Sequence, residues 1–322
     1  MDSLGNSHPR NHGLDFLKGI AACFIVFVHV TFPKPFGLFV AYLGSFGVSV
    51  FFMTAGYFSV GASSAKLLHS VKRTFIYLLV AYVLYLFRLL VIEDFHIQPV
   101  MDFLVNEVFT WEHLLKTLVL SQSKICYVAW FLISLIMCYV LKMVLGKNLR
   151  YLGYLGLVAG IVVVLPPIGN YMDFPISNPW LWGVPFFVLG EIVHEHENKL
   201  NEALSRPVLV LLCLTGVAIS LLSRYCGTQW WHIANMILAP ALFVLFSNSG
   251  MKYNRFCLLG GTYAFFIYII HPLVMFSYNA LREHPGVAES WLRPFIVLAV
   301  TVLLAAVYYR IKSVLSARFR RE

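Results

Sequence analysis

Long apolar runs alternate with short polar segments along the whole chain. Each run approaches the ~17 to 25 residues that a helix needs to cross a bilayer. We distinguish about ten such runs, which predicts an all-α, polytopic membrane helix bundle. The runs fall at about residues 14–32, 36–60, 74–92, 125–145, 150–168, 179–194, 207–223, 231–247, 256–278 and 293–311.

The overall composition agrees with a membrane protein. Of the 322 residues, 60% are hydrophobic and 12% are charged, whereas soluble domains are roughly half apolar. The six cysteines show no CxxC spacing, and no metal site is predicted from them. Cys126 and Cys226 both fall near one predicted face of the membrane, so they could form a disulfide.

The positions of lysine and arginine predict the orientation, because cytoplasmic loops retain positive charge. If both termini are cytoplasmic, the outer loops hold few of the 24 cations: Lys34, Lys116, Lys124, Arg224, Arg282 and Arg293. Lys18 and Arg88 lie within predicted spans, and every other cation is inside. The net charge of +9 is therefore mainly a topology signal, and we expect a lipid bilayer and not a nucleic acid as partner.

The chain divides into a cytoplasmic tail at 1–13, a membrane domain at 14–311 and a basic cytoplasmic tail at 312–322. Between about 93 and 124, apolar residues recur at helical spacing among acids and tryptophan, which predicts an amphipathic helix at the outer interface. The segment "PPIGNYMDFPISNP" is rich in proline, glycine and asparagine. We expect it to form an ordered loop over the outer mouth.

The first apolar run, "GLDFLKGIAACFIVFVHVTF", contains three ionisable residues, Asp15, Lys18 and His29. A charge in mid-bilayer costs ~3 kcal/mol or more, so such residues are functional candidates that face the bundle interior. At 100° per residue the three lie within about 60° of one another, with His29 about 16 Å along the axis from Lys18. One helix face therefore joins the two sides of the membrane. Alternatively, Asp15 and Lys18 form only an intrahelical pair and His29 bonds a neighbouring helix.

A second histidine lies in the late run "LLGGTYAFFIYIIHPLVMF". His271 is as far from the start of its helix as His29 is from the start of the first, so we expect the two at one depth. Tyr268 falls on the same face, and Pro272 opens the local backbone ladder. His271 could also be a core histidine that bonds a backbone carbonyl. Glu191, near an inner helix end, is expected to be a solvated cap or a partner for an inner cation.

These residues carry a resemblance to the integral-membrane acyltransferases called acyltransferase family three, which O-acylate surface carbohydrates. The segment "LDFLKGIAACFIVFVH" is similar to the family's first-helix pattern, in which ten residues separate an arginine from a histidine. Here ten residues separate Lys18 from His29, with lysine in place of the arginine. "VSVFFMTAGYF", "AWFLISLIMCYV" and "LGGTYAFFIYIIHPLV" resemble three further family segments in the same order. The resemblance covers nearly the whole chain.

The resemblance implies roles for particular residues. His29 would be the catalytic residue, and Lys18, Lys72 and Arg73 would contact the acyl-CoA donor. Positions along the predicted helices add further candidates. We expect Asp15 to position Lys18, His271 to stand beside His29 in the catalytic site, and Trp130 and Tyr268 to line the substrate site. Lysine keeps the charge of arginine but loses its bidentate fork, and the loop "KLLHSVKRTF" departs from the arginine pair that the family often carries.

The resemblance also implies a reaction. An acyl group, most simply acetyl, would pass from cytosolic acyl-CoA, a co-substrate and not a bound cofactor, to a hydroxyl of a polysaccharide or lipid-linked glycan outside a bacterial inner membrane. Two other functions fit the same residues. In a proton-linked transporter or membrane binding module, His29 and His271 would form a pathway, although no repeat of broken helices is visible. A hydrolase would use the same base to activate water.

Overall fold

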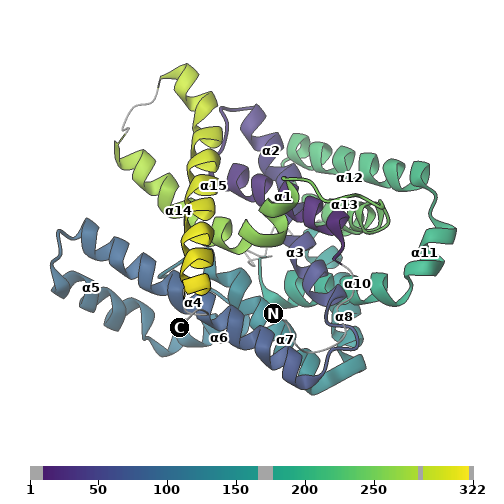
Figure 1. Ribbon diagram of the computed structural model, residues 1–322, viewed down its shortest axis with the longest axis horizontal. Helices are drawn as coiled ribbons and strands as arrows, with labels where there is room; N and C mark the ends of the chain where they lie inside the picture. The colour runs from purple at the N-terminus through teal and green to yellow at the C-terminus, as the bar shows by residue number, and fades with distance from the viewer. Residues whose placement is uncertain (1–9, 166–176, 282–285, 319–322) are drawn as a thin grey trace.

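The computed structural model describes residues 10–165, 177–281 and 286–318, and these residues form helices and connections without a strand (Figure 1). In chain order the elements of these described residues are α1 (His12–His29), α2 (Phe36–Gly44), α3 (Phe46–Tyr57), α4 (Ser64–Ile92), α5 (Ile97–Phe103), η1 (Leu104–Val108), α6 (Trp111–Leu120), α7 (Ala129–Leu145), η2 (Gly146–Asn148), α8 (Leu149–Val164), η3 (Pro179–Gly183), α10 (Val184–Glu195), α11 (Glu197–Ala203), α12 (Arg206–Cys226), α13 (Trp231–Ser247), η4 (Leu259–Tyr263), α14 (Ala264–Leu281) and α15 (Val287–Arg318).

The prediction of an all-helical membrane bundle is confirmed. Among the described residues, seven stretches are long and apolar enough to cross a membrane, and one of them, Ala129–Val164, contains both α7 and α8. Helix α13 is apolar but has 17 residues, and α10 has 12. Each of the ten predicted runs contains helix, but the count of ten and the cytoplasmic termini remain predictions.

Two predicted segments differ from the structure. The run at 36–60 consists of two helices, α2 and α3, which meet at Ser45. The Ser45 hydroxyl donates a hydrogen bond to the carbonyl oxygen of Tyr42 at 2.6 Å. The amphipathic segment after α4 is not one helix: η1 ends at Val108, and a new helix, α6, starts after its N-cap Thr110. The loop predicted over the outer mouth falls mostly at 166–176, outside the described residues.

Helix α1 lies at the centre of the bundle and packs against α2, α3, α13, α14, α15 and η4. Glycine permits its closest contact. A Cβ on Gly260 of η4 would lie 2.0 Å from the carbonyl oxygen of Asp15, and one on Gly13 would lie 1.9 Å from the carbonyl oxygen of Phe246. Backbones of membrane helices approach this closely only where side chains are small. The two glycines therefore allow the N-terminal half of α1 to pack closely against η4 and α13.

A buried ion pair joins α7 to α10. Glu191 is fully buried, and its Oε1 lies 2.5 Å from Nζ of Lys142 and accepts a hydrogen bond from the Ser59 hydroxyl at 3.0 Å. Of the two expectations for Glu191, the partner for an inner cation is confirmed and the solvated cap is wrong. The solvated cap is wrong because the Glu191 side chain meets Lys142 of α7 and Ser59, just after α3, and not solvent.

The possible disulfide is also wrong. Cys126 is buried in the segment before α7, Cys226 is exposed at the end of α12, and both are free thiols. Depth along the membrane normal was the only basis for pairing them, and depth does not determine which helices are neighbours. Helix α12 packs on α13 and α2, whereas α7 packs on α4.

Candidate functional site

The two predicted histidines lie next to each other. The rings of His29 and His271 have their centroids 5.2 Å apart, with their planes inclined at 34°. His29 is the last residue of α1 and is half-buried, whereas His271 lies within α14 and is fully buried. The expectation that the two histidines share a depth is therefore confirmed, and His29 is the more accessible of the pair.

The backbone of α14 holds His271 in one orientation. Its Nδ1 lies 2.9 Å from the carbonyl oxygen of Ile267, one turn earlier. Pro272 has no N–H, so it leaves the carbonyl of Tyr268 without its helical donor, and His271 also interacts with that carbonyl. The neutral ring then has a proton on Nδ1 and a lone pair on Nε2, and Nε2 is buried with no partner among the described residues. The alternative of a core histidine bonded to a backbone carbonyl is therefore confirmed for Nδ1 but not for Nε2.

Tyr268 and Tyr127 complete the surroundings of the histidines. Tyr268 is buried, its ring lies 6.2 Å from that of His271, and its hydroxyl donates to the carbonyl of Val128. This bond fixes the segment before α7, in which the Tyr127 ring lies edge-on to His29 at 5.3 Å. The site therefore combines α1, α14 and the entrance to α7.

Trp130 does not contact the histidines in the structure. Its ring packs on Phe52 at 6.3 Å and on Trp182 at 6.1 Å, while the next residue, Phe131, packs on Tyr268 at 5.1 Å. Adjacent residues of a helix point about 100° apart. The "AWF" segment therefore presents phenylalanine to the site, and tryptophan faces the neighbouring helices.

The N-terminal end of α1 contains a three-membered charge cluster. Asp15 is buried; its Oδ1 lies 2.9 Å from Nζ of Lys18 and its Oδ2 lies 2.5 Å from Nε of Arg10. The predicted pairing of Asp15 with Lys18 is present. Two cations around one carboxylate leave the cluster with a net positive charge. Helix α1 is continuous from this cluster to His29, so the two ends are ~16 Å apart at 1.5 Å per residue.

Lys72 and Arg73 are exposed on α4, which packs mainly on α7 and on α14. The charge of Arg73 acts on the hydroxyls of Tyr139 in α7 and Tyr309 in α15. Lys18 instead lies against η4, where a Cβ on Gly260 would be 2.6 Å from its own Cβ. Tyr263 of η4 stacks on Tyr309 at 5.4 Å.

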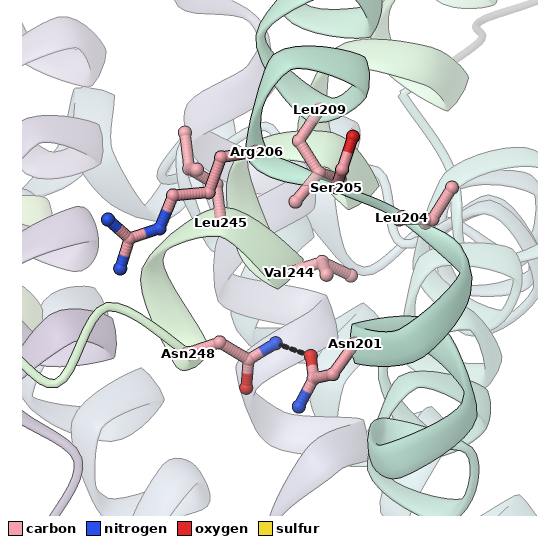
Figure 2. Close-up of a pocket in the computed structure, with 8 residues that line it drawn as sticks. All are labelled: Asn201, Leu204, Ser205, Arg206, Leu209, Val244, Leu245 and Asn248. Carbon is pink, nitrogen blue, oxygen red and sulfur yellow. Dashed lines mark hydrogen bonds between the residues drawn. The ribbon is translucent and has the colours of Figure 1, made fainter.

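A pocket of about 300 Å³ opens where α11, α12 and α13 meet (Figure 2). Leucine and valine side chains form one side of its wall. On the other side, the side-chain amide of Asn248 donates a hydrogen bond to the side-chain oxygen of Asn201. It lies at the end of the bundle where α1 begins, because the Asn11 side chain bonds the carbonyl of Ser247, the residue before Asn248, at 2.8 Å. The pocket is therefore separate from the two histidines, which lie at the other end of α1.

Three residues near these sites had no predicted role. Arg10 falls in the polar tail, and only its spacing of five from Asp15 could have indicated the ion pair. Tyr127 stands just before "AWF", where a tyrosine at the outer end of a span is also typical of an interface anchor. Arg88 was visible as a cation within a span; it lies over Phe276 of α14, with its Cζ 3.9 Å from the ring centroid.

Comparison with known proteins finds relatives that match part of this chain. Glucans biosynthesis protein C of Escherichia coli O139:H28 is 28% identical over 173 residues, which are 50% of this chain and 44% of that protein. The same protein of Escherichia coli O9:H4 matches with the same values. The chain thus matches less than half the length of these curated relatives. No solved structure matches.

A protein-family model matches most of the chain and identifies its family. The model, described as an acyltransferase domain, matches residues 11–310, which include both histidines, Asp15 and Lys18. They also include every candidate span except the end of the last one, Glu289–Ala317. Together with the membrane helices, this match makes the chain an integral membrane protein, and it belongs to the acyltransferase 3 family.

Proposed function

We propose that this protein transfers an acyl group, most simply acetyl, from acyl-CoA to a hydroxyl of a cell-surface polysaccharide or lipid-linked glycan. The observation that carries the proposal is the His29–His271 pair, 5.2 Å apart at one end of α1, whose other end holds the Arg10–Asp15–Lys18 cluster. A base at one end and a cationic cluster at the other fit a reaction whose two substrates enter from opposite sides.

In the proposed reaction His29 is the general base. Its neutral imidazole takes the proton of the acceptor hydroxyl as the oxygen attacks the thioester carbon. The carbon–sulfur bond then breaks, the acyl group stays on the acceptor oxygen, and the proton passes to the CoA thiolate. His271 has a free Nε2 beside the His29 ring, so it can hold His29 in a productive orientation or share its proton.

The donor enters at the inner end in this proposal. CoA carries several phosphate charges, and Lys18 on α1 together with Lys72 and Arg73 on α4 would supply the cations that bind them. Asp15 keeps Lys18 in place through its 2.9 Å contact. The pantetheine arm would follow α1 for the ~16 Å between Lys18 and His29. Tyr268 lines the site in this proposal, and Trp130 supports it from the neighbouring packing.

The proposed membrane topology follows from the entry of the donor and the acceptor from opposite sides of the membrane. We infer that both termini face the cytoplasm, that about ten spans cross the bacterial inner membrane, and that His29 lies on the outer side. The relatives named glucans biosynthesis protein C support a carbohydrate acceptor, although they match over less than half of their own length.

The test is a transfer assay on the purified full chain, combined with mass spectrometry of surface polysaccharide in cells with and without the protein. We expect acyl-CoA-dependent O-acyl groups that disappear with the gene and with His29→Ala. Unchanged polysaccharide would exclude the glycan acceptor.

Calorimetry with acetyl-CoA separates this enzyme from the proton-linked transporter, which has no reason to bind CoA. No affinity at millimolar ligand would favour the transporter. Release of free acid without an acceptor, at the rate of transfer, would favour the hydrolase.

A further inference from the structure

Arg88 lies beside the proposed catalytic site although no role has been assigned to it. It is one turn before the end of α4, and its guanidinium lies over the ring of Phe276 on α14 at 3.9 Å. Phe276 belongs to the partly buried layer that packs on the core. An arginine near the end of a lipid-facing helix usually extends toward headgroups, whereas this one is turned toward the bundle.

A short path of contacts leads from Arg88 to His29. The ring of Tyr127 lies 6.3 Å from the Phe276 ring and 5.3 Å from the His29 ring. The charge of Arg88 also acts on the Tyr127 hydroxyl. Arg88, Tyr127 and His29 therefore border one region, at the end of α1 opposite its N-terminal charge cluster.

The charge of Arg88 is not neutralised within the described parts of the chain. The ion pairs there involve Arg10, Lys18, Lys116, Lys124, Lys142 and Arg150, and none involves Arg88. A cation–π contact satisfies one face of a guanidinium but leaves its five N–H donors free to bind an anion. An uncompensated cation in a membrane span is costly, and such residues mark functional sites.

We propose that Arg88 binds an anionic group, a carboxylate or a phosphate, carried by the glycan acceptor while the acceptor hydroxyl lies at His29. The inference rests on the proposed function for the identity of the occupant. The guanidinium fork matches both oxyanions bidentately. The contact with the Phe276 ring restrains the guanidinium, so less rotational freedom is lost on binding. The acceptor is then an acidic or phosphate-bearing glycan, and Arg88 selects it over neutral sugars.

The test compares two ligands that differ in one group, hexyl β-D-glucoside and hexyl β-D-glucuronide, with the purified full chain and without acyl-CoA. Charge-assisted hydrogen bonds contribute enough for the glucuronide to bind roughly 10- to 100-fold more tightly. Arg88→Gln should remove this preference and keep the affinity for the glucoside. Arg224→Gln, a matched change of a half-buried arginine at the end of α12, should keep the preference. Equal wild-type affinities, or a preference that survives Arg88→Gln, would overturn the proposal.

A second measurement needs no variant and so does not depend on folding of Arg88→Gln. Phenylglyoxal modifies accessible arginines, and mass spectrometry locates the modified residues. The glucuronide should protect Arg88 of the wild-type chain, and the glucoside should not. Protection by phosphatidylglycerol micelles but not by the glucuronide would assign the site to a lipid headgroup and overturn an acceptor subsite. Because both measurements omit the donor, a failed transfer assay leaves their result intact.

Discussion

At the scale of single residues, the chemistry depends on where each side chain falls on its helix. The helical period alone places Asp15, Lys18 and His29 on one face of α1, and the Asp15–Lys18 contact of 2.9 Å agrees. Counting residues from the helix starts also places His29 and His271 at one depth. Counting could not find Tyr127, because its approach to His29 depends on how the connection that precedes α7 folds.

The first prediction concerns the base. His29→Ala should reduce acyl transfer by at least ~100-fold, the usual contribution of general base catalysis, while expression and detergent stability stay near wild type because the residue is half-buried at a helix end. Transfer of label from acetyl-CoA measures the effect. His96→Ala, an exposed histidine after α4, is the control and should be fully active. A well-expressed His29→Ala protein with substantial activity would exclude His29 as the base.

A second prediction concerns Lys18. Lys18→Arg should retain acyl-CoA affinity, since arginine keeps the charge and adds a fork for phosphate. Lys18→Met should weaken binding by about 10-fold, the value of one charge-assisted hydrogen bond, and should also leave Asp15 with Arg10 as its only cation. Isothermal calorimetry on detergent-purified protein measures both. Equal affinities for wild type and Lys18→Met would move the donor site away from the inner end of α1.

At the scale of elements, apolar run length predicted where helices lie better than where they break. The break between α2 and α3 and the π-helical turns η3 and η4 lie within apolar runs, so a hydrophobic average passes over them. The π turn η4 directly precedes α14, and such turns are frequent at functional sites. It brings "LGG" against the carbonyl of Asp15, a contact that depends on tertiary packing and that no local pattern could reveal.

The third prediction belongs to the α7–α10 contact. Glu191→Gln should destabilise the protein by ~3 to 5 kcal/mol, because it leaves Lys142 charged and nearly buried without its partner. The double change Lys142→Met, Glu191→Met should recover much of the loss, since both charges are removed together. Thermal unfolding in detergent measures this. Glu112→Gln breaks an exposed pair on α6 and should give no measurable shift; a shift as large as that of Glu191→Gln would contradict the role of burial.

For the whole molecule, the distribution of charge predicted an orientation that the arrangement of helices does not test. The bundle has two chemically distinct ends. One holds Arg10, Asp15 and Lys18, and the other holds the histidines and Arg88. Which end faces the cytoplasm follows only from the lysines and arginines of the loops.

Labelling with an impermeant thiol reagent from outside the cell tests this orientation. The native Cys226, exposed at the end of α12, should react. In a Cys226→Ser background, Lys147→Cys and Lys252→Cys should not react, while Gln98→Cys on α5 should. Reaction at Lys252→Cys would reverse the orientation or change the number of spans, and would place the histidines on the donor side.

The length of α4 has a consequence for the bilayer around the protein. Ser64–Ile92 and Glu289–Ala317 each have 29 residues, or ~43 Å of helix, against a hydrocarbon thickness of ~30 Å. Helices of this length must tilt or extend beyond the lipid, and the tilt changes with membrane thickness. Because few residues of α4 are buried in the bundle, lipid can alter its tilt and thereby the depth of Arg88. The same purified protein should therefore show different transfer rates in vesicles of short-chain and long-chain lipids.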